Sequence, residues 1–143
     1  MSEIMFHKCR PEDAEGLCAL IRNELGYTDV TADEVCSSLE KMLSSDDYFT
    51  IAAGVDGDIY AYISTVREIS LEEGEHYRVI ALAVKSEYRD QGLGTALLTL
   101  AESNAKANGA RLITLSSQFK RTEAHQFYEK LGYVKTSYTF KKY

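Results

Sequence analysis

Cysteine, proline and long apolar runs are all scarce in this chain of 143 residues. The three cysteines, Cys9, Cys18 and Cys36, are widely spaced and form no Cys-x-x-Cys pair, so the sequence indicates neither a disulfide framework nor a zinc knuckle. The three histidines are equally scattered, and no metal site is expected. The single proline and the lack of any Ser/Gly/Pro-rich stretch leave no linker, which predicts one domain over residues 1–143.

Apolar runs and positive charge are also limited. No stretch approaches about 18 apolar residues in a row, and the N-terminal MSEIMFHKCRPEDAEG lacks the apolar core of a signal peptide. Lysine and arginine number 16 against 22 acidic residues, which gives a net charge of −6. Nucleic-acid binders are usually basic, so no nucleic-acid partner is expected. Because long apolar runs are lacking, no membrane partner is expected either. We expect a cytoplasmic protein, whose acidic surface is compatible with a cationic small molecule or peptide.

The chain does contain a regular succession of strand and helix patterns. Strands are expected over 4–9, 48–55, 58–69, 76–85 and 110–117, with a final strand or strand pair in the tail, 133–143. Helices are expected over 10–25, 31–43 and 122–131, and a further long helix ends near residue 108. Thr31 and Glu34 have the spacing of a capping box, and Asp56-Gly57 is a hairpin signal. The order βααβββαβαβ predicts an α/β (α+β) fold with one mixed, mostly antiparallel sheet and helices on both faces.

The stretch 88-YRDQGLGTALL-98 places two glycines directly before the long helix. The first N–H groups of a helix have no partner inside it, and the helix dipole favours negative charge at that end. Glycine lets the backbone approach an anion closely and adopt positive φ. Arg89 and Gln91 add donors beside Gly92 and Gly94. A phosphate-binding turn and a plain, glycine-softened helix entry therefore both fit this stretch.

Known phosphate-binding sequence patterns narrow the range of ligands that this glycine turn could bind. A Walker A loop needs Gly-Lys-Ser/Thr, and a dinucleotide fingerprint needs a third glycine; both are absent. The pattern Arg-x-x-Gly-x-Gly fits Arg89, Gly92 and Gly94 without departure. A protein that binds ATP or NAD through this turn is disfavoured by these absences, and competition among coenzyme A, ATP and NAD would decide it.

A second stretch, 121-RTEAHQFYEKLGY-133, is an amphipathic helix followed by glycine and an aromatic residue. Alone it predicts only a helix with core aromatics. Together with ALAVKSEYRDQGLGTALL, about thirty residues earlier, and with the strand order, it makes the whole chain resemble the GCN5-related N-acetyltransferase (GNAT) superfamily. The resemblance implies a single N-acetyltransferase domain whose sheet splays open beside its fourth strand, with acetyl-CoA bound in the gap.

The resemblance also implies which residues bind coenzyme A. The pantetheine arm would pair with the backbone of the fourth strand, and the pyrophosphate would bind the N–H groups at the helix start. The implied binding residues are Leu82, Ala83, Val84, Arg89, Asp90, Gln91, Gly92, Leu93, Gly94, Thr95 and Arg121. Arg121 departs from the family pattern, because many relatives carry an asparagine there.

The implied chemistry is direct acyl transfer to an amine in a ternary complex. Tyr128 matches the tyrosine that protonates the leaving thiolate, although a packed aromatic is its plain alternative. The base is less clear: Arg78 stands where some relatives carry glutamate, so His76 is a weak candidate beside Glu73, Glu75 and a water chain. An acyl-cysteine route is the rival mechanism, with Cys9 as the only cysteine near a histidine, His7.

The amine acceptor is left open by the sequence. A primary amine of a small molecule or peptide is expected, held by acids and tyrosines of the loops between the helices and strands. The alternative function is a non-catalytic module that binds or senses acyl-CoA. Family members often form homodimers, so a homodimer is compatible with the resemblance.

Overall fold

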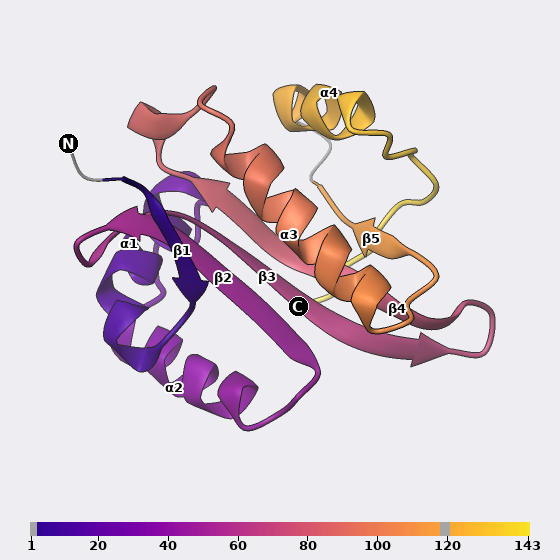
Figure 1. Ribbon diagram of the computed structural model, residues 1–143, viewed down its shortest axis with the longest axis horizontal. Helices are drawn as coiled ribbons and strands as arrows, with labels where there is room; N and C mark the ends of the chain where they lie inside the picture. Colours follow the sequence, from indigo (N-terminus) through magenta and orange to yellow (C-terminus); the bar gives the residue numbers. More distant parts are fainter. Residues whose placement is uncertain (1–2, 118–120) are drawn as a thin grey trace.

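The computed structural model describes residues 3–117 and 121–143. Its centre is a five-stranded sheet in the order β1-β2-β3-β4-β5, antiparallel except for the parallel pair β4–β5 (Figure 1). The strands are β1 (Met5–Lys8), β2 (Tyr48–Val55), β3 (Asp58–Ser70), β4 (Gly74–Val84) and β5 (Ile113–Leu115). The predicted fold class, one mixed and mostly antiparallel sheet with helices on both faces, is confirmed.

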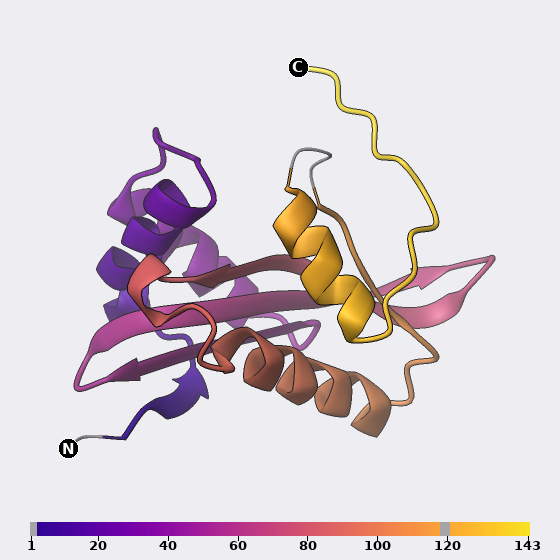
Figure 2. The ribbon, with the colours of Figure 1, turned by 90° about the horizontal axis from the view of Figure 1, so that it is seen from above.

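Helices cover both faces of the sheet, and Figure 2 shows α1 and α2 on the side opposite α3. The four α-helices are α1 (Ala14–Glu24), α2 (Ala32–Leu43), α3 (Leu93–Ala107) and α4 (Thr122–Lys130), and two 3-10 turns are η1 (Pro11–Asp13) and η2 (Ser86–Tyr88). One buried cluster joins α1 and α2 to Ala52, Tyr62 and Ala83 of the sheet. A second cluster joins α3 to Ile63 and Val79 from the other face.

Several local sequence signals form the structures that they predict. The Thr31 side chain accepts a hydrogen bond from the Glu34 backbone N–H at 3.2 Å, and the Glu34 side chain accepts one from the Thr31 N–H, which completes the capping box. The hairpin between β2 and β3 turns at Asp56 and Gly57, both with positive φ (49° and 90°). These signals succeed because their energetics lie within a few neighbouring residues.

The sheet opens beside β4, as the resemblance implies. β5 pairs with β4 only over Tyr77 to Val79, whereas β4 continues to Val84 beside β3. At the point of separation the register with β3 shifts, so that Ser64 lies opposite Ala81 and Thr65 opposite Val79. Ile80 is therefore an extra residue, a β-bulge, and its side chain is exposed. Half of β4 consequently has a free edge.

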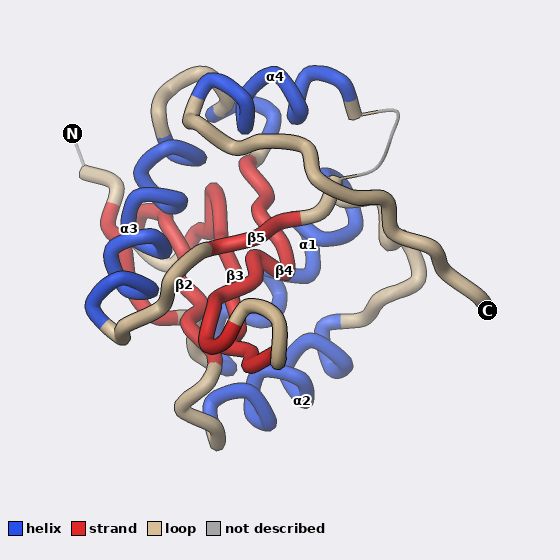
Figure 3. The backbone as a smooth tube through the Cα atoms, turned by 90° about the vertical axis from the view of Figure 1, so that its right-hand side faces the viewer, coloured by secondary structure: helices blue, strands red, loops and turns tan. Residues whose placement is uncertain are grey.

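The tail does not form the strand expected over 133–143. It has no regular structure, and Figure 2 shows it leaving the end of α4 and running away from the sheet. Its apolar side chains Val134, Tyr138 and Phe140 are exposed. The alternating pattern that predicted a strand is present, but a strand also needs an edge with which to pair. β5 is the outer strand of the sheet (Figure 3). It is only three residues long, where eight residues were expected to be extended.

Two other boundaries differ from the sequence prediction. β4 begins at Gly74 and β3 reaches Ser70, so the loop expected between the strands 58–69 and 76–85 is only a three-residue turn, and Glu75 lies within the sheet. The first helix begins with η1, and α1 proper starts at Ala14. In the described part of the chain, no helix is both long and apolar enough to cross a membrane.

Candidate active site

The free edge of β4 supplies unpaired backbone groups beside the bulge. The Lys85 N–H donates to the Tyr60 carbonyl of β3 at 2.8 Å, and backbone directions alternate along a strand. Leu82 and Val84 therefore direct their N–H and C=O groups away from β3, toward the gap that β5 has left. Ala83 directs its backbone toward β3 and buries its side chain against the α1–α2 cluster.

The glycine loop, defined here as residues 89–95, follows β4 and η2 and leads into α3. Asp90 and Gly92 have positive φ (62° and 84°), and Gly92 is the N-cap of α3. Within the described residues, no protein oxygen accepts a hydrogen bond from a backbone N–H between Asp90 and Thr95. The first helical bond runs from the Ala96 N–H to the Gly92 carbonyl at 2.9 Å. The loop thus presents a group of unsatisfied donors at a helix N-terminus, the arrangement that binds phosphate.

The two long polar side chains of the glycine loop contact protein rather than the open side of the loop. Arg89 pairs with Glu24 at the end of α1, and its Nε lies 3.5 Å from the Val84 carbonyl oxygen. The Gln91 amide donates to the Glu87 carbonyl at 3.4 Å. The anion-binding capacity of the loop therefore comes from the backbone and the helix dipole rather than from these side chains.

Helix α4 brings Tyr128 against the second core cluster. Its ring meets Phe127 at a centroid distance of 5.4 Å and Tyr133 edge-on at 6.1 Å. Burial raises the pKa of Tyr128 above 10.0, an effect that the positive charge of Arg121 opposes. The hydroxyl therefore keeps its proton at neutral pH, as a general acid must. Arg121 itself is the exposed N-cap of α4, with no side-chain capping bond.

His76 is buried near the hairpin end of β4, four residues before the bulge. Its Nδ1 lies 3.1 Å from the Gly74 carbonyl oxygen, and its Nε2 lies 3.6 Å from a Glu68 carboxylate oxygen. Arg78 donates to the same Glu68 oxygen at 3.1 Å. Both ring nitrogens thus face protein oxygens. Two further base candidates from the sequence, Glu73 and Glu75, lie in or next to the β3–β4 turn.

The cysteines have the environment of packing residues. Cys9 and Cys18 are buried in the α1–α2 cluster. Burial, reinforced by the charge of Asp13, raises the pKa of Cys9 to about 12, so its thiolate is scarce at neutral pH. His7, the histidine nearest Cys9 in sequence, pairs instead with Asp13 at 3.0 Å. This arrangement favours direct transfer over an acyl-cysteine intermediate.

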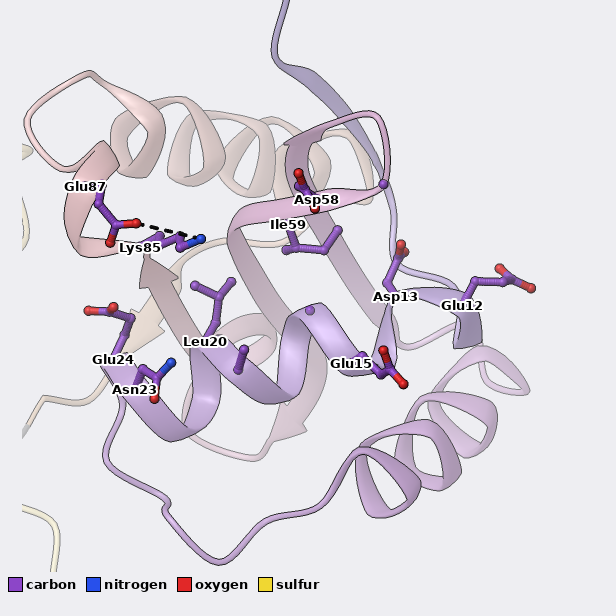
Figure 4. Close-up of a pocket in the computed structure, with 13 residues that line it drawn as sticks. Glu12, Asp13, Glu15, Leu20, Asn23, Glu24, Asp58, Ile59, Lys85 and Glu87 are labelled. Atoms are coloured by element: carbon purple, nitrogen blue, oxygen red, sulfur yellow. Dashed lines mark ion pairs between the residues drawn. The ribbon is translucent and has the colours of Figure 1, made fainter.

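Two cavities lie on the α1–α2 side of the molecule. One, of about 430 Å³, is lined by the α1–α2 loop and includes Tyr27, Asp29 and Glu34. The other, of about 340 Å³, lies between α1, the β2–β3 turn and the end of β4 (Figure 4). Neither is lined by the glycine loop or by Tyr128. Among the described residues, no group of three or more His, Cys, Asp or Glu side chains could hold a metal ion.

Three contributors to the site have no signal in the sequence. Glu24 reaches the glycine loop from a position 65 residues earlier, and Ile80 forms the bulge through register alone. Ser117, just past β5, has a buried hydroxyl with no hydrogen-bond partner among the described residues. That hydroxyl, the free β4 edge and the unsatisfied N–H groups of the glycine loop all fit a long ligand carrying amides at one end and phosphates at the other.

Comparison with known proteins agrees with this geometry. The family model described as "Acetyltransferase (GNAT) family" matches residues 15–133. The aminoalkylphosphonate N-acetyltransferase of Salmonella typhimurium is 32% identical over 127 residues, 88% of this chain and 79% of the relative. A GNAT family acetyltransferase structure from Staphylococcus aureus has 27% identity and a TM-score of 0.79, with 100% of this chain and 99% of that chain covered.

A third comparison concerns the fold of a coenzyme A complex. The structure of the aminoglycoside N-acetyltransferase AAC(6')-Iy in complex with CoA has a TM-score of 0.86 at 14% identity, covering 100% of this chain and 95% of that one. The chain belongs to the acetyltransferase (GNAT) family and is an acetyl-CoA-dependent N-acetyltransferase of that family.

Proposed function

We propose that the enzyme transfers the acetyl group of acetyl-CoA to a primary amine of a small molecule or peptide, by direct attack in a ternary complex. The observation that carries this proposal is the continuity of two sets of outward-facing backbone groups, in which the Val84 carbonyl accepts a hydrogen bond from the Arg89 Nε at 3.5 Å. The outward-facing backbone of Leu82 and Val84 leads along one strand into the unsatisfied N–H groups from Asp90 to Thr95. An extended cofactor with an amide-bearing arm and a diphosphate matches this path.

The cosubstrate supplies a thioester, and the chain supplies alignment and protons. The backbone of Leu82 and Val84 holds the arm, and the glycine loop binds the diphosphate. The amine nitrogen attacks the carbonyl carbon, the carbon–sulfur bond breaks, and the Tyr128 hydroxyl gives its proton to the departing thiolate. A raised pKa suits Tyr128 to this task because the hydroxyl stays protonated until it is needed. Arg121 lies close enough to oppose that shift, and we infer that it approaches the same ligand.

The attacking amine must first lose a proton, since an alkyl ammonium is not a nucleophile. His76 is held between Gly74 and Glu68, and its nitrogens face those oxygens rather than the free β4 edge. We therefore assign deprotonation to water at the bulge, with the Glu68–His76 pair farther along β3 and β4 toward the hairpin. The histidine remains a weak candidate for the base.

The acceptor is proposed to enter from the side of the α1–α2 loop. The cavity there carries the carboxylates of Asp29 and Glu34 and the ring of Tyr27, which suit an ammonium group through charge and cation–π attraction. The related Salmonella enzyme is named for aminoalkylphosphonates, which are small primary amines. Polyamines, aminoglycosides, amino acids and peptide N-termini have the same reacting group.

We further propose that the enzyme is a homodimer in which each tail pairs with the other copy. Val134, Tyr138 and Phe140 alternate along the tail and are 79%, 71% and 92% exposed. The tail carries Lys135, Lys141 and Lys142 and no acidic residue, in a chain whose net charge is −6. A basic, alternating segment is complementary to an acidic copy of the chain with an open β5 edge.

One set of measurements tests the proposed reaction. Calorimetry with coenzyme A, ATP and NAD should show binding of coenzyme A in preference to both nucleotides. Thiol release from acetyl-CoA should then be followed with an aminoalkylphosphonate, a polyamine, an aminoglycoside, an amino acid and a peptide as acceptors. We expect release to depend on a primary amine. Preference for ATP or NAD would refute the binding site, and thiol release that no amine accelerates would refute the reaction.

A further inference from the structure

Glu24, the last residue of α1, makes four contacts with Ser86 in η2 and with Arg89, the first residue of the glycine loop. Its carboxylate accepts hydrogen bonds from the Ser86 backbone N–H at 3.3 Å and from the Ser86 hydroxyl at 3.1 and 3.0 Å. The Arg89 guanidinium donates to its Oε1. These partners are 62 and 65 residues away in sequence. One carboxylate therefore joins the end of α1 to both ends of the turn η2.

Burial distinguishes this contact from an ordinary surface ion pair. The Glu24 side chain is 9% exposed, whereas Arg89 is 53% exposed. Figure 4 shows Glu24 at the end of α1, next to the segment that carries Lys85 and Glu87. The neighbouring pair Lys85–Glu87 is longer, at 3.8 Å, and its carboxylate is 66% exposed. A largely buried carboxylate with several donors is costly to disrupt, whereas an exposed pair contributes little.

The other side of η2 is fixed by aromatic stacking. The Tyr88 ring lies on the Tyr60 ring of β3 at a centroid distance of 3.9 Å and an angle of 10°. The Lys85 N–H donates to the Tyr60 carbonyl at 2.8 Å. The segment from Lys85 to Arg89 is therefore held by β3 on one side and by α1 on the other. Glu24 is the only one of these anchors that comes from outside the β3–β4 part of the sheet.

We propose that Glu24 is a positioning residue for coenzyme A: it fixes η2 and Arg89 so that the N–H groups from Asp90 to Thr95 are preorganised for the diphosphate. This inference rests on the proposed function of the glycine loop. Glu24 does not touch the cofactor; it acts through Ser86 and Arg89. A backbone site binds best when its donors are already aligned, because the ligand then need not order them.

The same contact links the two substrates. Glu24 ends α1 one residue before the α1–α2 loop begins to turn, and that loop lines the cavity containing Tyr27 and Asp29. Rigid coupling of the α1 end to the glycine loop fixes the acceptor loop relative to the cofactor. Loss of the carboxylate should therefore weaken acetyl-CoA binding first. Any effect on acceptor binding should become visible only when acetyl-CoA saturates its site.

The test compares Glu24→Gln with Glu87→Gln in the full chain. Both variants remove one negative charge near η2, but only the first removes the pairing with Arg89. For Glu24→Gln we expect the KM for acetyl-CoA and the Kd for coenzyme A to rise about tenfold, corresponding to roughly 1.4 kcal/mol, while kcat at saturating acetyl-CoA changes little. Glu87→Gln should leave all three constants unchanged.

A charge exchange separates positioning from general stability. In Glu24→Arg/Arg89→Glu the ion pair is reversed, and coenzyme A affinity should exceed that of either single variant if the link itself matters. Unchanged coenzyme A binding in Glu24→Gln would overturn the inference. Tighter binding would also overturn it, since it would mean that Glu24 holds Arg89 away from the phosphates. Failure of the wild-type chain to bind coenzyme A would instead refute the proposed function.

Discussion

The ring of Phe127 on α4 lies against Gly94 on α3: a β-carbon added at Gly94 would be 3.2 Å from Phe127 Cζ. By contrast, a β-carbon at Gly92 would meet nothing within 4 Å, yet Gly92 has a φ of +84°. The two glycines of one motif therefore serve different purposes. Gly92 allows the left-handed backbone of the loop, and Gly94 allows α4, with Tyr128, to approach α3.

The first prediction concerns Gly94→Ala. Alanine favours an α-helix over glycine by about 1 kcal/mol, but crowding against Phe127 should cost about 1–3 kcal/mol, so we expect net destabilisation and a lower kcat as Tyr128 shifts. In a Phe127→Leu background, which lacks the Cζ atom, the same change should become stabilising. Urea unfolding of the four proteins in this double-mutant cycle measures whether Gly94→Ala raises or lowers the free energy of unfolding in each background. Equal effects in both backgrounds would contradict the contact.

The second prediction is that Gly92→Ala weakens coenzyme A binding. A non-glycine residue in the left-handed region costs about 1–2 kcal/mol, so the loop should rearrange and its N–H groups should lose alignment. Gly57→Ala is the matched control, because Gly57 also has positive φ and open space around it, but lies in the β2–β3 turn. Calorimetry should show weaker binding only for Gly92→Ala, and equal affinities would exclude the glycine loop as the diphosphate site.

The third prediction tests the proton donor. Tyr128→Phe should lower kcat about 10²-fold or more, with little change in coenzyme A affinity, because only the hydroxyl is removed. Tyr133→Phe is the control on the adjacent ring: its hydroxyl donates to Glu102 at 2.7 Å, so its loss should reduce stability more than turnover. Burial raises the Tyr128 pKa above 10.0, so deprotonation of Tyr128 should not lower the wild-type kcat below pH 10. Full activity of Tyr128→Phe would remove it from the mechanism.

The fourth prediction concerns Cys9 and alkaline pH. Its pKa is raised from 9.0 to about 12 by burial and by Asp13, so the folded chain holds this proton more tightly than the unfolded chain. Its contribution to stability is therefore complete below pH 9 and is lost as pH rises toward 12, by about 1.4 kcal/mol per pH unit. Unfolding free energies at pH 8 to 10 should fall less steeply in Cys9→Ala.

The same variant tests the acyl-cysteine route. Direct transfer requires no thiol, so the kcat of Cys9→Ala at neutral pH should stay near that of the wild-type enzyme. Abolished turnover in a folded Cys9→Ala protein would show that the thiol is needed, and would favour the covalent route.

The fifth prediction concerns the tail. The double variant Tyr138→Ser/Phe140→Ser should shift the enzyme from dimer to monomer in light scattering, because it removes two exposed apolar side chains of the alternating stripe. Lys135→Ser/Lys142→Ser alters the same segment without touching these side chains, and should weaken the dimer mainly at low salt. A wild-type protein that is monomeric at all concentrations would contradict the tail pairing.

The sequence alone determined the elements whose energetics are local. The Thr31–Glu34 capping box, the Asp56-Gly57 turn and the apolar faces of α1 and α3 each depend on residues within a few positions of one another. The conformation of the glycine loop was also predictable, because the glycines that allow positive φ and the apolar pattern that begins the helix lie within one short stretch. The order of strands and helices then left few ways to form one sheet.

The tertiary structure decided what depends on distant partners. The bulge at Ile80 exists because β3 and β4 change register there, and the carboxylate of Glu24 reaches Ser86 and Arg89 only because α1 packs across the sheet. The tail has the alternating pattern of a strand but no adjacent strand edge with which to pair, so the strand predicted from the pattern alone was wrong. Alternation reports which side chains share a face, whereas a strand forms only when its backbone hydrogen bonds find a partner, and that partner is set by the whole fold.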